Sequence, residues 1–172
     1  KTGKRFMNEH AGRKVKSDAI FACMAQSDKN DNYPVNICDQ AAVDANNIAY
    51  TKKGVEEGSI KKFNTLEELA KAYNIPLEPF LETIKNFNEY VKNEKDPEFG
   101  KPLTKADVNG IGITKAPFYA SETTPKILYC MGGVEINTKA QVISATTHEP
   151  IAGLYAAGEI TGGVHGASRL GT

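Results

Sequence analysis

The stretch GLYAAGEITGGVHG, residues 153–166, is the part of this 172-residue sequence that most narrows the fold. It begins with an apolar run that predicts a buried strand, and the glycines that follow let a backbone approach a ligand without side-chain obstruction. Glu159, just beyond the strand, has a carboxylate that can accept hydrogen bonds from ribose hydroxyls. Because the chain has no GxGxxG motif, this stretch alone predicts either structural turns or part of a ligand cradle.

Outward from this stretch, the sequence predicts mostly helices in the first half and short strands in the second. Runs of strand-favouring residues between turn residues predict strands at 4–8, 33–38, 118–123, 127–130, 134–137, 140–144 and 154–157. Apolar residues at helical spacing predict helices at 18–26, 65–73 and from Pro79 onward. This partial segregation of helices and strands predicts an α+β fold.

The helix starts carry the clearest local signals. At Thr65 the hydroxyl can accept a hydrogen bond from the amide three residues on, and the Glu68 carboxylate can reach back to the Thr65 amide. Ser17 is the predicted cap of the helix at 18–26. The helix after Pro79 has an apolar stripe that is predicted to pack against a sheet: Phe80, Ile84, Phe87 and Val91. Residues 93–116 are predicted to be a connecting loop.

Composition narrows the classes of partner. The 21 basic residues balance 21 acidic residues, so no net field predicts binding to nucleic acid or to an anionic membrane. No run approaches the roughly 18 apolar residues of a membrane helix, and the chain is expected to be soluble. The three cysteines are too scattered for a disulfide framework or a metal site, and they are predicted to be buried thiols.

Four motifs follow one another in the second half of the chain. They are MGGVxIN at 131–137, AQV at 140–142, GLYAAGE at 153–159 and GGVHGAxRLG at 162–171. In order and spacing they resemble the closing half of the soluble fumarate reductase and succinate dehydrogenase flavoprotein family. GKRFxNE at 3–9 is similar to the segment that leads into the capping domain of that family. The resemblance runs through the chain but is loose between residues 27 and 95.

The resemblance implies FAD as the cofactor and assigns it residues of the second half. Glu159 falls where the family binds the FAD ribose. The backbones expected near the cofactor are those of Gly132, Gly133, Gly158, Gly162 and Gly163. His165 matches a family histidine in the loop near the flavin, where a packing or backbone-bonding role is as good an interpretation as chemistry.

The resemblance also implies residues that bind the substrate carboxylate and deliver protons. Arg169 falls where the family's arginine grips a substrate carboxylate, a role that suits a planar, permanently charged fork. Glu9 and Arg13 resemble the family's proton-delivery carboxylate and arginine, and they would face each other if this stretch is helical. The alternatives are a surface arginine at the chain end for Arg169 and an ordinary exposed ion pair for Glu9 and Arg13.

Two departures from the family change the expected substrate. Fumarate reductases carry substrate-binding histidines before the MGG motif, whereas Tyr129 stands where one of them belongs. A tyrosine can donate a hydrogen bond or a proton but cannot form a cationic clamp. Residues 40–50 contain no arginine, although the family's proton-donating arginine should lie there. We therefore expect reduction, or the reverse dehydrogenation, of an activated C=C bond in another unsaturated acid or enone, with Tyr129 as the hypothetical proton donor.

The expected organisation is a capping-type α+β domain at 1–116 and a partial FAD-binding segment at 117–172. The parent would be an FAD-dependent oxidoreductase acting on CH-CH bonds of a small unsaturated carboxylate. The missing GxGxxG fold and the glycine-rich end predict an interrupted flavin site, so the chain alone is expected to be inactive without the remainder of the flavoprotein. One alternative is a non-catalytic cap that docks on a separate flavoprotein chain through an apolar face on strands between 118 and 157. Another is a plain structural domain without flavin affinity.

Overall fold

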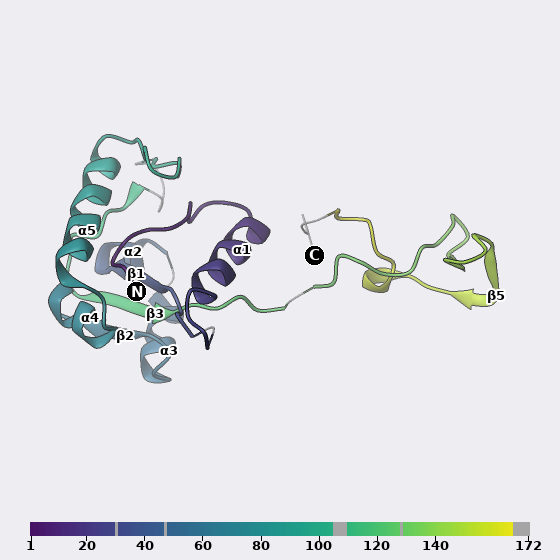
Figure 1. Cartoon of the computed structure of the whole chain (residues 1–172), viewed down its shortest axis with the longest axis horizontal. Coiled ribbons are helices and arrows are strands. Elements are labelled where there is room, and N and C mark those ends of the chain that lie inside the picture. The colour runs from purple at the N-terminus through teal and green to yellow at the C-terminus, as the bar shows by residue number, and fades with distance from the viewer. Residues whose placement is uncertain (30, 47, 105–109, 128, 167–172) are drawn as a thin grey trace. The chain divides into compact units, whose positions relative to one another are not determined.

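The computed structural model describes residues 1–29, 31–46, 48–104, 110–127 and 129–166 (Figure 1). Helices and strands are mixed, and the predicted α+β class is confirmed. The chain divides into two compact units. The larger contains Lys1–Ala11 and Val15–Pro125, and the smaller contains Gly12–Lys14 and Lys126–Thr172.

A three-stranded antiparallel sheet lies at the centre of the larger unit. Its order is β1 (Val35–Asp39), β3 (Phe118–Glu122) and β2 (Lys61–Phe63), so the strand that comes last in the sequence lies in the middle. Every residue of β1 and of β2 has a partner in β3. Phe118 and Tyr119 are buried, as expected of a central strand.

Helices α4 (Leu66–Ala72) and α5 (Leu77–Lys92) follow β2 in the chain, and both contribute buried side chains to the core of this unit (Figure 1). The predicted capping box is present, since Glu68 N donates to Thr65 Oγ1 at 3.1 Å and Thr65 N donates to Glu68 Oε2 at 3.3 Å. The main hydrophobic cluster joins these helices to β3 through Leu69, Ala70, Tyr73, Phe80, Ile84, Phe118 and Ala120. The apolar stripe predicted after Pro79 therefore does pack against a sheet.

The first residues of the chain differ from the prediction. Helix α1 (Arg13–Met24) starts earlier than expected, so Ser17 lies inside the helix and is not its cap. The predicted strand at 4–8 is wrong, because no residue of this segment pairs with a strand. Side chains fix the segment instead, and Asn8 Nδ2 donates to Phe99 O at 3.2 Å.

Two helices between β1 and β2 were not predicted, α2 (Gln40–Ala45) and α3 (Ile48–Glu56). Asp39 explains the start of α2, since its buried carboxylate accepts a hydrogen bond from Ala42 N at 3.0 Å. The same carboxylate accepts from the backbone amides of residues 114 and 115 at 2.9 and 2.8 Å. One buried acid thus fixes both a helix start and the segment that leads into β3.

The smaller unit contains a hairpin of β4 (Gln141–Ile143) and β5 (Pro150–Tyr155), followed by the short helix η2 (Gly158–Ile160). The predicted strands at 140–144 and 154–157 are therefore present with shifted bounds. The predicted strand at 134–137 is reduced to an isolated bridge between Ile136 and Val142. The predicted strand at 127–130 falls partly outside the described residues, and its other residues form no strand.

Burial in the smaller unit also differs from the prediction. β5 was expected to be buried, but all of its residues are exposed in this chain, including Leu154 and Tyr155. The apolar face expected on strands between 118 and 157 is thus found on β5 and not on the buried β3. The prediction of buried thiols is wrong for Cys130, which is exposed, whereas Cys23 and Cys38 are half-buried.

The boundary expected between residues 116 and 117 does not coincide with the division between the compact units. β3 completes the sheet of the larger unit, and the division falls after Pro125. The assignment of cap and flavin segments stays a prediction. Within the ranges that the structure describes, no helix combines the length and the apolar character needed to cross a membrane.

Candidate functional site

The predicted cofactor residues lie on two segments of the smaller unit that contact each other directly. Val134 N donates a hydrogen bond to Ile160 O at 2.8 Å, and Gly163 N donates to Met131 O at 3.2 Å. These bonds hold segment 131–134 against segment 158–163. They bring together six predicted cofactor residues: Gly132, Gly133, Gly158, Glu159, Gly162 and Gly163.

Glycine is needed where these two backbones meet. A Cβ atom on Gly133 would overlap Ile160 O and Gly162 N, and one on Gly162 would overlap Gly133 N. Gly163 adds a φ of +91°, in a region that L side chains rarely adopt. A Cβ on Gly132, by contrast, would meet nothing within 4 Å. The close contact therefore depends on particular glycines, and the Gly132 side is open.

A small hollow beside these glycines is lined by Tyr129, Cys130, Met131, Glu159 and residues 161–165. Its walls carry a carboxylate and two aromatic side chains. Glu159 is exposed, and its Oε1 accepts a hydrogen bond from Cys130 N at 2.9 Å. The rings of Tyr129 and His165 meet edge to face, with centroids 5.6 Å apart. Tyr129, Glu159 and His165 therefore line the hollow together with the glycine backbones.

This arrangement fits the ribose and ring contacts expected of FAD. Among the described residues, Glu159 Oε2 has no hydrogen-bond partner and can accept one from a ribose hydroxyl. A Cβ atom on Gly132 or on Gly163 would meet nothing within 4 Å, so the backbone is open to a ligand at these two glycines. The residues that would hold FAD are Glu159 and the backbones of Gly132, Gly133, Gly162 and Gly163.

Arg169, the predicted substrate arginine, lies outside the described residues, and its role stays a prediction. Metal chemistry gains no support from the described ranges, where no group of three or more His, Cys, Asp or Glu side chains is placed to hold an ion.

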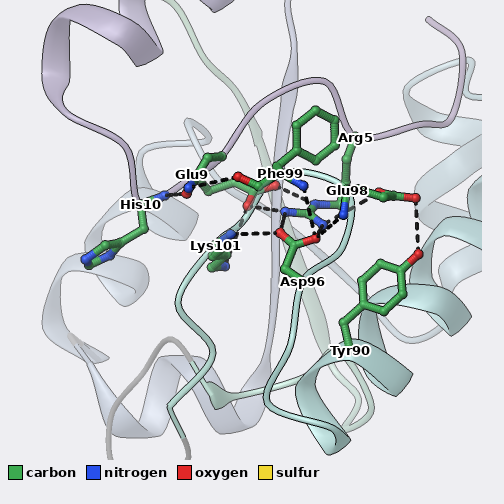
Figure 2. Close-up of polar contacts among 9 residues, drawn as sticks. Arg5, Glu9, His10, Tyr90, Asp96, Glu98, Phe99 and Lys101 are labelled. Atoms are coloured by element: carbon green, nitrogen blue, oxygen red, sulfur yellow. Dashed lines mark hydrogen bonds and ion pairs between the residues drawn. The ribbon is translucent and has the colours of Figure 1, made fainter.

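A second polar cluster lies in the larger unit and centres on Arg5 (Figure 2). Its Nε and Nη2 donate to the two carboxylate oxygens of Glu9, each at 2.8 Å. Nη1 and Nη2 also donate to the two oxygens of Asp96, at 3.1 and 2.8 Å. The guanidinium carbon lies 5.2 Å from the ring centroid of Phe87 and 5.0 Å from that of Phe99. Arg5 is thus bidentate to two acids and within cation–π distance of two aromatic rings.

Asp96 anchors this cluster to the turn that follows α5. Its side chain has no exposed surface, and its carboxylate accepts hydrogen bonds from the backbone amides of Glu98, Phe99 and Lys101. Burial alone would raise the pKa of Asp96, but the hydrogen bonds from Arg5 and from the amides of Lys101 and Phe99 outweigh it and lower this pKa to about 2. The Asp96 charge is therefore stabilised by its surroundings.

The surroundings shift the pKa values of Arg5 and Lys101 in opposite directions. Burial would lower the pKa of Arg5, but its hydrogen bonds to Glu9 and Asp96 raise that pKa above its ordinary value. Lys101 has a lowered pKa, first because of burial and despite the charge of Glu9. Its Nζ lies 3.8 Å from Glu9 Oε2. Glu9 consequently has two basic neighbours in this cluster.

The expected pairing of Glu9 with Arg13 is wrong. The segment that carries Glu9 is not helical, and α1 begins only at Arg13, so the two side chains are not on one helix face. Glu9 pairs with Arg5, four residues before it, and Arg13 is exposed. The catalytic roles of Glu9 and Arg13 stay predictions.

Sequence reasoning missed Arg5, Asp96 and Lys101 as members of a site. The spacing of Arg5 and Glu9 could have indicated a pair, because it equals the spacing considered for Glu9 and Arg13. Asp96-Pro97 is a turn signal directly after a helix, and an Asp there can accept several backbone amides. No local sequence pattern indicates the hydrogen bonds between Arg5 and Asp96, because these residues lie 91 positions apart.

Segments 131–134 and 158–163 of the smaller unit carry the glycines and the acid on which the predicted flavin site depends. A family described as "FAD binding domain" matches residues 1–172. The chain belongs to this family, which confirms FAD as the expected cofactor.

Named relatives support the resemblance to fumarate reductase flavoproteins. The chain is 44% identical over 171 residues to the acrylate reductase flavoprotein subunit of Shewanella woodyi, covering 99% of this chain and 33% of the relative. It is 39% identical over 175 residues to the NADH:acrylate oxidoreductase of Vibrio harveyi, covering 99% and 16%. The open conformation of a flavocytochrome c3 fumarate reductase matches with a TM-score of 0.68 and 35% identity, covering 95% and 27%. The chain thus spans a third or less of these proteins.

Proposed function

We propose that this chain forms the substrate-side part of an FAD-dependent oxidoreductase that reduces an activated C=C bond in an unsaturated carboxylic acid. The observation that carries the proposal is the glycine-lined hollow in which Tyr129, Glu159 and His165 meet. The names of the acrylate and fumarate reductases among the relatives support the same reaction class.

Each predicted site residue has a separate task in this proposal. The chemistry that reduced FAD would supply when bound is a hydride for one carbon of the double bond. Glu159 binds a ribose hydroxyl, and the glycine backbones admit the cofactor. Tyr129 donates its phenolic proton to the neighbouring carbon, which gives the saturated acid. Arg169 binds the substrate carboxylate with its planar fork.

The proposed substrate is a small unsaturated acid other than fumarate. Tyr129 offers a neutral hydrogen-bond donor where fumarate reductases place a histidine, so one cationic contact for a second carboxylate is lost. Two relatives are named for acrylate, which has a single carboxylate. The single guanidinium proposed for substrate binding, that of Arg169, matches one carboxylate.

Glu9 and Arg13 are proposed to deliver protons toward the substrate. Glu9 has a partly exposed carboxylate and a fixed ion-pair partner, which suits a group that must be both accessible and well placed. Arg13 is exposed at the first residue of α1.

A second candidate is a non-catalytic cap that docks on a separate flavoprotein chain. The exposed apolar side chains of β5, Ile151, Leu154 and Tyr155, favour this candidate because such a face gains stability when a partner covers it. It predicts association in solution without any turnover of unsaturated acids.

The replacement Tyr129→Phe tests the catalytic proposal in a flavin-loaded protein that contains this chain. Loss of a general acid lowers kcat by about 100-fold or more, whereas FAD content stays the same. Tyr155→Phe is the matched control, because Tyr155 is an exposed tyrosine on β5 outside the hollow. Unchanged turnover in Tyr129→Phe would remove Tyr129 as the proton donor.

A further inference from the structure

Thr161 is a buried polar residue of the smaller unit to which the proposed function gives no task. It is 8% exposed, whereas the three residues of η2 directly before it are all exposed. Thr161 N donates to Gly158 O at 3.1 Å, which is the hydrogen bond that closes this short helix. Thr161 Oγ1 donates to the same carbonyl oxygen at 2.8 Å. Two donors of one residue therefore hold the η2 turn closed.

The start of η2 receives little support from its own residues. Ala157, the residue before the helix, forms no side-chain capping bond. Gly158 has a φ of +81°, and a glycine can leave such a conformation for many others. A 3-10 helix of three residues has few backbone bonds of its own. The Thr161 hydroxyl thus adds a bond at the point where the turn is least constrained.

Glu159, in the middle of η2, connects this turn to the neighbouring segment. Its Oε1 accepts a hydrogen bond from Cys130 N at 2.9 Å. That amide belongs to the peptide that joins Tyr129 to Cys130, so the bond fixes the backbone directly after Tyr129. Among the residues that the structure describes, the second oxygen of Glu159, Oε2, accepts no hydrogen bond. The direction of η2 therefore decides whether the carboxylate can hold Cys130 with one oxygen and a ligand with the other.

A rival explanation is that the backbone bonds between the two segments place Glu159 by themselves. These bonds are formed by Ile160 O and Gly163 N, both of which follow Glu159 in the chain. Thr161 Oγ1 instead reaches back to Gly158, the residue directly before Glu159. The backbone bonds and the hydroxyl bond thus act on opposite sides of Glu159, and their effects can be separated by experiment.

We infer that Thr161 is a positioning residue, whose hydroxyl fixes the η2 turn so that Glu159 holds Cys130 N with one oxygen and presents the other to a cofactor hydroxyl. The inference deepens the proposed function and rests on it for the contact between Glu159 and FAD. Thr161 acts through Glu159 and transfers no proton. Without its hydroxyl, Gly158 O keeps the Thr161 amide as a donor, but the turn gains freedom and the carboxylate loses its fixed direction.

The first test follows the Cys130 amide by NMR. In the 172-residue chain labelled with nitrogen-15 cysteine, only three backbone amides give signals, and Cys130→Ser identifies one of them. Thr161→Val removes the hydroxyl at nearly constant size, so the Cys130 amide should exchange with heavy water about fivefold faster or more. Thr161→Ser keeps the hydroxyl and should stay within about twofold of the unaltered chain. Equal exchange in Thr161→Val and the unaltered chain would overturn the inference.

Two controls belong to the same spectra. The Cys38 amide lies in β1, opposite Tyr119 of β3 in the larger unit, and its exchange should stay constant in every variant. Thr83→Val is the matched replacement, because Thr83 Oγ1 also donates to a carbonyl oxygen, that of Pro79, at 2.8 Å. It should leave the Cys130 amide unchanged. A rise as large as that in Thr161→Val would attribute the effect to general destabilisation and overturn the inference.

The second test is the affinity for FAD, measured by flavin fluorescence as FAD is added back to the flavin-depleted protein that contains this chain. Thr161→Val should raise the Kd about tenfold, and Thr161→Ser should change it less than about twofold. Added to Glu159→Ala, Thr161→Val should raise the Kd no further. Losses that multiply would overturn the inference, because Thr161 would then act without Glu159.

Glu159→Asp keeps the test decisive if Thr161→Val does not fold. It leaves both Thr161 donors in place and draws the carboxylate back by one methylene, so exchange of the Cys130 amide should again rise about fivefold or more. Unchanged exchange would contradict the need for a directed carboxylate.

The amide measurement also separates this inference from the proposed function. A protein that shows the Cys130 effect but reduces no unsaturated acid would contradict the proposed function and leave Thr161 as the residue that positions Glu159. A protein that reduces unsaturated acids, but whose Cys130 amide is unaffected by Thr161→Val, would overturn the inference alone.

Discussion

Asp96 shows how one residue can connect distant parts of this chain. Its carboxylate accepts hydrogen bonds from Arg5, 91 positions away, and from three amides of its own turn. An acid with this many donors remains charged in spite of its burial. Removal of its charge would leave the buried Arg5 guanidinium with Glu9 as its remaining hydrogen-bonded acid.

Asp96→Asn should therefore destabilise the larger unit by about 3 kcal/mol at pH 7, the low end of the usual cost of removing one partner from a buried ion pair, because Arg5 keeps Glu9. The free energy of unfolding in urea measures this change. Glu89→Gln is the control and should change it by less than about 0.5 kcal/mol, since Glu89 forms an exposed pair with Lys92. A loss in Asp96→Asn as small as in the control would mean that the Arg5 charge is solvated in another way.

The same residue predicts a pH dependence of stability. The pKa of Asp96 is lowered from 3.8 to about 2 on folding, so its contribution is fully present above pH 3.8 and is lost as the pH falls toward 2. The stability gap between the unaltered chain and Asp96→Asn should narrow by about 2 kcal/mol between pH 5 and pH 2. Urea unfolding at a series of pH values measures this gap. A gap that does not change with pH would contradict the lowered pKa.

At the scale of elements, the contact between segments 131–134 and 158–163 sets the shape of the candidate flavin hollow. Gly133→Ala should disrupt this contact, because its Cβ would overlap the Ile160 carbonyl oxygen. Gly132→Ala is the matched packing control, with no atom within 4 Å of its Cβ. Two-dimensional amide NMR spectra should show shifted signals from residues 158–163 in Gly133→Ala but not in Gly132→Ala. Equal, small changes in both spectra would contradict the close packing.

Helix α4 offers a test of local structure. Thr65→Ala removes the hydroxyl that accepts from Glu68 N and should cost about 1 kcal/mol of stability. Thr65→Ser keeps this acceptor and should remain within about 0.5 kcal/mol of the unaltered chain. Thermal unfolding followed by circular dichroism compares the two variants. If serine were as destabilising as alanine, packing of the threonine methyl and not the capping bond would explain the loss.

The elements that the sequence predicted well are those with strong local signals. The capping box at Thr65 and the apolar stripe after Pro79 depend on neighbours within one or two turns, and both are present. The start of α2 depends on Asp39, whose other partners lie 75 and 76 positions away, so local pattern did not reveal it. The exposure of β5 could not be predicted either. An apolar run indicates that a strand has a surface suited to burial, but it does not indicate which segment packs on that surface.

The candidate residues were predictable to a different degree in the two units. In the smaller unit, comparison with the family motifs indicated Tyr129, Glu159, Gly162, Gly163 and His165, and these residues line one hollow. The partner of Glu9 was predicted incorrectly, because the expected helix at Glu9 does not form. A spacing of four residues predicts an ion pair only where the backbone between the two residues is helical.

At the scale of the whole molecule, the proposed function is that of part of an FAD-dependent reductase of unsaturated acids. The chain spans 33% of the Shewanella woodyi relative, so the reaction is best followed in a flavin-loaded protein that contains it. The most direct measurement is anaerobic reduction of the bound FAD, followed by addition of acrylate, fumarate or a saturated acid while the visible flavin absorbance is recorded. We predict rapid return of the oxidised flavin spectrum with acrylate, slower return with fumarate and none with the saturated acid. Bound flavin that stays reduced with every unsaturated acid would contradict the proposed function.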